Sequence, residues 1–157
     1  MSRLILPVVA VLSLATPAMA VPTQAEVDQY QQRVEDLQEA LDGLIDDHAE
    51  RTVQLNQAFV NGDISATELA IEQEFLSQIY NLISGTQNLI NVLQVAVNEM
   101  QNMFNMYSQS TGYIQQYALN EYNSRKANAD QVIDQIEDQL AAILATILFG
   151  YDIWFAT

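Results

Sequence analysis

Apolar residues recur every three or four positions along the first long segment of the chain, which is the spacing of one face of a helix. The motif formed by Thr23 and Glu26 precedes this series and is typical of a capping box, which predicts the start of the helix. Two polar residues, His48 and Arg51, take the next positions of the series before it resumes. The pattern predicts a helix over residues 24–60. Its first apolar positions are Val27, Tyr30, Val34, Leu37, Leu41 and Leu44.

Two further segments carry the same periodicity. The second follows another capping motif, at Ser65, and has two adjacent apolar rows, so its apolar face is broad. The third develops a clear apolar stripe toward the C-terminus. We therefore expect an all-α fold, an elongated antiparallel three-helix bundle with coiled-coil-like packing. The predicted helices span residues 24–60, 66–109 and 113–150 of a single domain over residues 21–157.

The first twenty residues have the features of a secretory signal peptide. One cation, Arg3, is followed by an uncharged run over residues 4–15, and Ala18-Met19-Ala20 forms a small-x-small cleavage site. The apolar run is shorter than the ~20 residues that a membrane-spanning helix needs. We expect cleavage after Ala20 and export to a periplasm or to the extracellular space.

The exported chain would be strongly acidic. Loss of Arg3 leaves four basic residues against 20 acidic ones, a formal charge of −16. Such a surface repels phosphate backbones and contains no basic patch, which excludes nucleic acid as a main partner. The chain has no cysteine, so the fold has no disulfide and depends on packing alone.

The segment NGDISATEL fits two interpretations. In the first, Gly62 and Glu68 have the spacing of positions 6 and 12 of a calcium-binding EF-hand loop. Position 3 is then Phe59, which has no ligand oxygen, and the leading aspartate is absent. The calcium candidates under this interpretation are Asn61, Asp63 and Glu68.

The same residues also describe a corner between two helices. Asn-Gly favours a turn, Ser65 and Glu68 form a capping box, and Ile64 and Leu69 form a hydrophobic staple. This interpretation accounts for every matching residue without a metal. We therefore favour the corner over a calcium site.

His48 and Arg51 interrupt the apolar seam of the first helix. His48 is the only histidine, and it lacks the companion ligands that zinc or diiron sites need. Buried polar residues in coiled coils set the register of the helices. We interpret the pair as a register-setting polar layer rather than as a metal site.

Three methionines, Met100, Met103 and Met106, are candidate copper ligands, because thioethers bind Cu(I). Steps of three residues drift around a helix, and methionine commonly fills gaps in cores. No cysteine or nearby histidine supports a copper site. We favour packing here and expect no cofactor.

The second helix carries few charges. From Phe75 to Asn120 the only charged residue is Glu99, while asparagine and glutamine fill the polar positions. One interpretation is a central helix covered on two sides by its neighbours, which we favour. The other is a surface that contacts other subunits, where a buried charge would be costly. The candidate interface residues on this helix are Leu82, Ile83, Leu89, Ile90 and Phe104.

The C-terminal stretch LAAILATILFGYDIWFAT contains one charge, Asp152, and is apolar all around a helix. Such a helix is buried in protein or in lipid. The charge near its far end and the lack of a basic anchor argue against a membrane span. We favour core packing against the first two helices, and the alternatives are a tail that docks on another protein or inserts into a membrane. The residues concerned are Leu148, Phe149, Trp154 and Phe155.

Motifs for enzyme chemistry are absent: the chain has no cysteine nucleophile, one histidine and no glycine-rich phosphate loop. We therefore expect a non-enzymatic exported protein that contacts other protein subunits in a homo- or hetero-oligomer, as a structural component or adaptor. A leader followed by long helices rich in glutamine and asparagine is similar in general architecture to minor pilus-tip subunits of type IV secretion systems. That resemblance implies a place in a secretion or pilus-type apparatus. The alternatives are a membrane-active protein that uses the C-terminal segment and a weak metal-binding protein.

Overall fold

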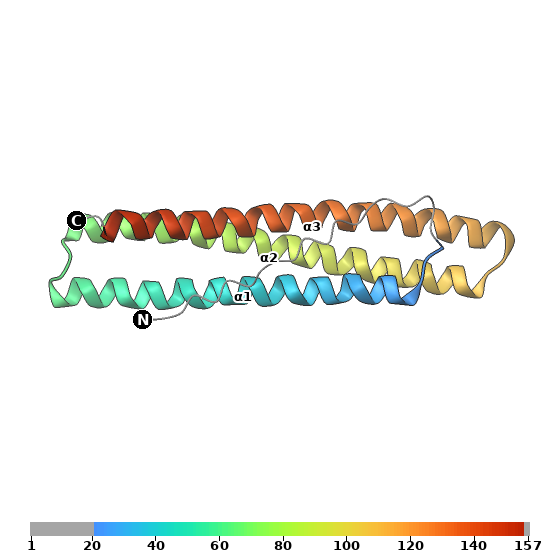
Figure 1. Cartoon of the computed structure of the whole chain (residues 1–157), viewed down its shortest axis with the longest axis horizontal. Coiled ribbons are helices and arrows are strands. Elements are labelled where there is room, and N and C mark those ends of the chain that lie inside the picture. The colour runs from blue at the N-terminus through green and yellow to red at the C-terminus, as the bar shows by residue number, and fades with distance from the viewer. Residues whose placement is uncertain (1–20, 156–157) are drawn as a thin grey trace.

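The computed structural model describes residues 21–155, with side chains described as far as residue 147. Three α-helices make up this part of the chain, and it contains no strand. They are α1 (Gln24–Asn61), α2 (Ala66–Gln109) and α3 (Gly112–Phe155). Figure 1 shows the helices side by side along one long axis, with alternating chain direction. The prediction of an all-helical fold of three packed helices is confirmed.

The helix bounds lie within one residue of the predicted ones except at the end of α3. That helix continues to Phe155 instead of ending at residue 150. Gly150 does not stop it, because a single glycine costs a helix only about 1 kcal/mol relative to alanine. Between α2 and α3 the connection is just Ser110 and Thr111, after which Gly112 adopts a φ of 60°.

Helix α2 is the central element of the core. Most contacts of α1 and of α3 are with α2, and these two helices approach each other much less closely. Leu93 and Met100 of α2 are fully buried, as are Leu41 of α1 and Ile136 of α3. Burial of each large apolar side chain contributes roughly 1.5–3 kcal/mol. The broad apolar face predicted for this helix is thus divided between two neighbours.

The N-terminal cap of α1 differs from the predicted capping box. Thr23 Oγ1 accepts a hydrogen bond from the Glu26 amide at 3.2 Å, as expected. The Glu26 carboxylate, however, accepts a hydrogen bond from Tyr122 Oη of α3 at 2.8 Å and pairs with Lys126. Only the threonine half of the box is therefore formed, because the glutamate links α1 to α3.

The α1–α2 corner begins with a Schellman motif. Gly62 has a φ of 79°, in the left-handed region that glycine tolerates. Its amide donates to the Phe59 carbonyl at 3.1 Å, and the Asp63 amide donates to the Ala58 carbonyl at 2.9 Å. These two bonds satisfy carbonyls that the end of a helix would otherwise leave unpaired.

The corner ends in the predicted capping box. Ser65 Oγ accepts from the Glu68 amide at 3.3 Å, and the Glu68 carboxylate accepts from the Ser65 amide at 2.7 Å. The bond from the Ser65 backbone, aided by the one from its side chain, lowers the pKa of Glu68. Ile64 is buried and Leu69 packs partly buried against the core. The capping box predicted for the corner is confirmed.

Two glycine substitutions in α1 and its cap are expected to change stability in opposite directions. A methyl group added at Gly43 or at Gly62 meets no atom within 4 Å, so only the backbone differs. Gly43→Ala lies inside the helix and should raise the free energy of unfolding by about 1 kcal/mol. Gly62→Ala should lower it by about 1 kcal/mol, because alanine is strained at positive φ. Urea unfolding measures both, and shifts of the same sign would contradict the cap geometry.

Candidate protein-contact surface

Three pairs of glutamine side chains join α1 to α2. In each pair both amide groups donate and accept, at N–O distances between 2.7 and 3.4 Å. The members are spaced seven residues apart on each helix, and we call the three pairs the glutamine ladder. The pairs are Gln24 with Gln101, Gln31 with Gln94, and Gln38 with Gln87.

The glutamine ladder favours one register of α1 against α2. A carboxamide donates and accepts, so two facing glutamines satisfy each other, and each bond contributes roughly 0.5–1.5 kcal/mol. A shift of one residue would separate all three pairs. The signal in the sequence is two series of glutamines seven residues apart. Sequence reasoning missed it, because glutamine is equally compatible with an exposed position.

The polar layer predicted at His48 and Arg51 also faces α2. His48 Nε2 lies 3.0 Å from the Leu76 carbonyl oxygen, and Arg51 forms an ion pair with Glu72 at 3.2 Å. Glu72 is buried, so this pair is largely shielded from water. Both side chains thus lie between two helices, where a register-setting layer would be. The register role itself stays a prediction.

Polar side chains also connect α1 to α3. Tyr30 Oη donates to Asp130, and Tyr122 Oη donates to Glu26. Both tyrosines are buried, and burial raises the pKa of each hydroxyl well above its usual value. The hydrogen bond to the carboxylate acts in the same direction. The hydroxyls therefore stay protonated and act as donors throughout the neutral pH range.

The structure places the predicted interface residues of α2 inside the chain. Ile83 and Ile90 are 6% and 3% exposed. Leu82, Leu89 and Phe104 are partly buried and pack against the same core. These side chains therefore serve contacts with α1 and α3, and the exposed side of α2 is formed by other residues.

The C-terminal candidates cannot be placed in this way, because their side chains lie outside the described part of the chain. They are Leu148, Phe149, Trp154 and Phe155. As far as the chain is described, none of its helices is both long enough and apolar enough to cross a membrane. The roles predicted for the C-terminal segment remain predictions.

The calcium candidates lie on the α1–α2 corner. Asn61 and Asp63 are exposed there, and the Glu68 carboxylate is engaged by the Ser65 amide. Within residues 21–147, no three His, Cys, Asp or Glu side chains lie close enough together to hold a metal ion. The geometry of the corner is that of two helix caps.

The copper candidates differ in their surroundings. Met100 is fully buried in the core, Met103 is partly buried, and Met106 is 37% exposed. Three thioethers at such different depths do not share one face of α2. Their arrangement fits the gap-filling role of methionine.

From Tyr80 to Gln109, the most exposed positions of α2 are all uncharged. These positions recur three or four residues apart, and we call the central six the neutral face. Val92 and Val95 at its centre are 49% and 58% exposed. Helix α2 is therefore covered on two sides, as the favoured interpretation expected, but its third side is open and has no charged residue among these six. The neutral face consists of Asn88, Asn91, Val92, Val95, Asn98 and Asn102.

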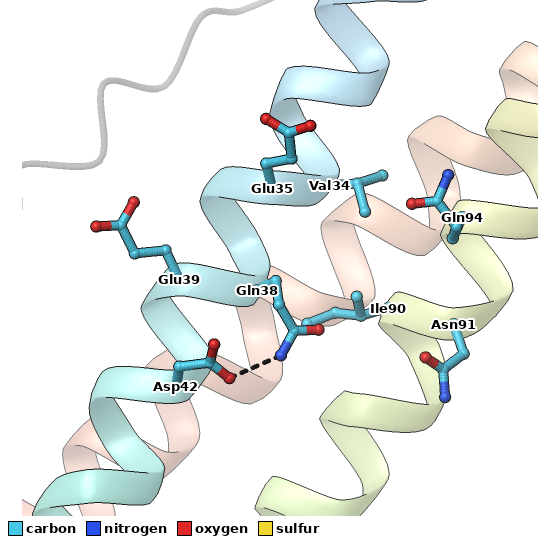
Figure 2. Close-up of a pocket in the computed structure, with 8 residues that line it drawn as sticks. All are labelled: Val34, Glu35, Gln38, Glu39, Asp42, Ile90, Asn91 and Gln94. Atoms are coloured by element: carbon cyan, nitrogen blue, oxygen red, sulfur yellow. Dashed lines mark hydrogen bonds between the residues drawn. The ribbon is translucent and has the colours of Figure 1, made fainter.

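A shallow groove follows the neutral face on its α1 side. Figure 2 shows Val34 and Ile90 between the helices, with three acidic side chains along the α1 edge. These are Glu35, Glu39 and Asp42, all of which are exposed. The volume of the groove is about 400 Å³. On this side the neutral face thus borders a negatively charged rim.

A second groove, of about 320 Å³, follows the neutral face on its α3 side. Val95 and Ala96 line it from α2, and Asn128 lines it from α3. Glu99 also lines this groove and pairs with Arg125 of α3 at 3.2 Å. Glu99 therefore has a cationic partner, which Arg125 shares with Glu121 at 3.5 Å. This side of the neutral face thus carries less negative charge than the α1 side.

The end of the α2–α3 hairpin is exposed and uncharged as well. Gln101 faces the first residue of α1, so about two turns of α2 extend beyond α1, and the start of α3 extends with them (Figure 1). Tyr113, Ile114 and Tyr117 are 86%, 55% and 48% exposed there. This end continues the neutral surface beyond the glutamine ladder.

Comparisons with known protein families, with curated proteins and with solved structures give no match to this chain. Any conclusion about function therefore depends on the surfaces that the chain presents. Among these, the neutral face combines exposure, apolar side chains and a lack of charged residues of its own.

A double-mutant cycle tests the glutamine ladder. Gln38→Ala and Gln87→Ala should each lower the free energy of unfolding. The double variant should lose about 1 kcal/mol less than the sum of the two single losses, because either change alone already removes the pair. Urea unfolding provides the free energies. The control is Gln32→Ala combined with Gln87→Ala, since Gln32 is exposed and bonds only within α1, to Asp36. That control should be additive, and an additive Gln38/Gln87 cycle would contradict the ladder.

The buried tyrosines predict a loss of stability at high pH. The folded-state pKa values of Tyr30 and Tyr122 are raised, so their contribution to stability is full below the unfolded value of about 10 and is lost as the pH rises above it. Tyr122→Phe should cost about 1.5 kcal/mol at pH 7, because the hydrogen bond to Glu26 is lost.

This difference between parent and Tyr122→Phe should narrow above pH 10, because the variant has no phenol to ionise. Unfolding free energies at pH 7, 9 and 11 measure it. Tyr113→Phe is the matched control, since Tyr113 is 86% exposed. A gap between parent and Tyr122→Phe that stays constant with pH would show that the raised pKa is not coupled to folding.

Proposed function

We propose that this chain is exported and acts without catalysis, as a structural component or adaptor that contacts protein subunits through the neutral face of α2. The observation that carries the proposal is the exposure of Val92 and Val95 in a stretch whose only charged residue is paired. Desolvation of valine and amide groups that find hydrogen-bonding partners costs far less than desolvation of charges.

The distribution of charge over the rest of the chain supports this proposal. Acidic residues dominate the exposed side of α1, where they keep the chain soluble and repel other acidic surfaces. If solubility alone determined the surface of α2, similar charges would be expected on it. The exposed carboxylates of α1 include Asp28, Glu35, Asp36, Glu39, Asp42, Asp46, Asp47 and Glu50.

The shape of the molecule favours contact over catalysis. Helix α2 has 44 residues and is therefore ~66 Å long, and the two grooves beside it are shallow and open to solvent. A rod with one long neutral side suits a subunit that docks lengthwise, as in a secretion or pilus-type apparatus. Enzyme sites are instead usually concave, with a few converging polar groups.

The start of the first helix is compatible with export. Helix α1 begins at Gln24, and its cap is Thr23, so cleavage after Ala20 would leave the capped helix intact. We expect the protein recovered outside the cytoplasm to begin at Val21. Intact mass measurement of the exported protein tests this, and recovery of only the full-length chain inside the cell would contradict export.

Site-specific photocrosslinking in the producing cell tests the contact surface. Benzoylphenylalanine replaces Val95 on the neutral face or Val53 on α1, a matched valine that is 64% exposed. Position 95 should give discrete protein adducts of defined mass, and position 53 should not. The absence of adducts from position 95, or the same adducts from both positions, would contradict the proposal.

A further inference from the structure

The neutral face also identifies the partner that fits it. We propose that a second copy of this chain docks on the neutral face, with the two α2 helices antiparallel about a two-fold axis at Val95. This inference rests on the proposed function, since it names the subunit that is contacted. In a two-fold pair the same patch of each copy meets the other, so the patch must be complementary to itself.

Amide side chains provide that self-complementarity. The glutamine ladder already shows antiparallel helices of this chain joined by amide groups that donate to and accept from each other. In the ladder, the residue numbers of each pair add to 125, as antiparallel alignment requires. Where two α2 helices face each other about a two-fold axis at Val95, the numbers of the two facing residues add to 190. Asn88 of one copy then faces Asn102 of the other. Val95 faces itself, and Asn98 faces Val92.

The ends of the exposed side of α2 follow the same symmetry. Asn81 and Gln109 are both exposed, and their numbers also add to 190. Ser84 and Met106 form another such pair, so the exposed thioether of one copy lies beside a small side chain of the other. Between Tyr80 and Gln109 no acidic residue of one α2 faces an acidic residue of the other, because Glu99, the only acidic residue of this stretch, falls opposite Asn91.

Electrostatics disfavours a basic partner on the neutral face and permits a second copy there. A basic partner would be attracted to the acidic side of α1, where the exposed carboxylates are, and not to a face without net charge. Two copies of a chain with a formal charge of −15 repel each other wherever those carboxylates meet. The neutral face allows close approach without that cost.

The α2–α3 groove is the side on which the second copy fits. Its walls include Val95, Ala96 and Asn128, and its one carboxylate is paired with Arg125. The ridge of one α2 can therefore enter the α2–α3 groove of the other, which is the usual way in which helices pack. The opposite groove has the acidic edge of α1, which would face the second copy with like charge. The resulting core contains α2 and α3 of each copy, with both α1 helices outside.

The small area of this contact surface indicates a weak, reversible dimer. Exposed positions continue from Tyr80 to Gln109, a length of ~45 Å at 1.5 Å per residue. With a helix about 10 Å wide, the strip covers roughly 450 Å² on each copy, so the pair is near the lower limit of about 1,000 Å² for a specific interface. We therefore expect a dimer that forms at high concentration and dissociates on dilution.

Cysteine crosslinking tests the alignment cleanly, because the chain has no cysteine of its own. Purified Val95→Cys, treated with diamide, should form a disulfide-linked dimer about tenfold more efficiently than Val53→Cys, because the two-fold axis brings its two thiols together. Asn88→Cys mixed with Asn102→Cys should give the mixed dimer in excess over either homodimer. Equal yields from positions 95 and 53, or none from position 95, would overturn the proposal.

Light scattering on the protein without cysteine provides an independent measurement. The average mass of the parent protein should rise toward that of a dimer with concentration, and Val95→Lys should abolish the rise, because its two cations would face each other on the axis. Val53→Lys should leave the rise unchanged. A parent that stays monomeric at every concentration would overturn the proposal.

The outcomes separate this inference from the proposed function. If Val95→Cys forms no dimer while photocrosslinking at position 95 in the cell yields adducts with a different protein, the second copy is excluded and the contact function stands. If position 95 yields no adduct of any kind in the cell and purified Val95→Cys forms no dimer, both proposals fail.

Discussion

The packing of α2 against both other helices is the constraint on which the rest of the structure depends. Because α1 and α3 approach each other little, each is held mainly by its contacts with α2. Helix α2 therefore uses two sides for burial and has one side left for solvent or for a partner. Long polar side chains, such as Arg33 with Glu137 and Lys126 with Glu26, bridge the wider space between α1 and α3.

The parts of this fold that depend on local sequence were predictable. Apolar spacing located the three helices, and Ser65 with Glu68 located the start of α2, because periodicity and capping involve residues close together in the chain. The same reasoning failed for Glu26. A glutamate three residues after a cap can turn back to the cap or reach a distant helix, and only the position of Tyr122 decides between them.

The candidate surface was predictable only in part, for a related reason. The scarcity of charge between Phe75 and Asn120 is visible in the sequence, but the residues first assigned to the interface, such as Ile83 and Ile90, are the apolar ones that fill the core. A broad apolar face predicts how much of a helix is buried, not which neighbour buries it. The positions that remain exposed are asparagines and isolated valines, which become informative only when α1 and α3 are in place.

The contact between α1 and α2 and the exposed neutral face share one chemical feature, which is amide side chains in place of charged ones. Where α1 meets α2, paired glutamines join the helices without placing charge at the contact, and the outward carboxylates of α1 stay in solvent. The neutral face repeats this chemistry on a surface that stays exposed among the described residues. An isolated amide array would also be soluble in water, so asparagine alone does not define a contact surface. The exposed Val92 and Val95 at its centre do, because their burial contributes free energy only when another surface excludes water from them.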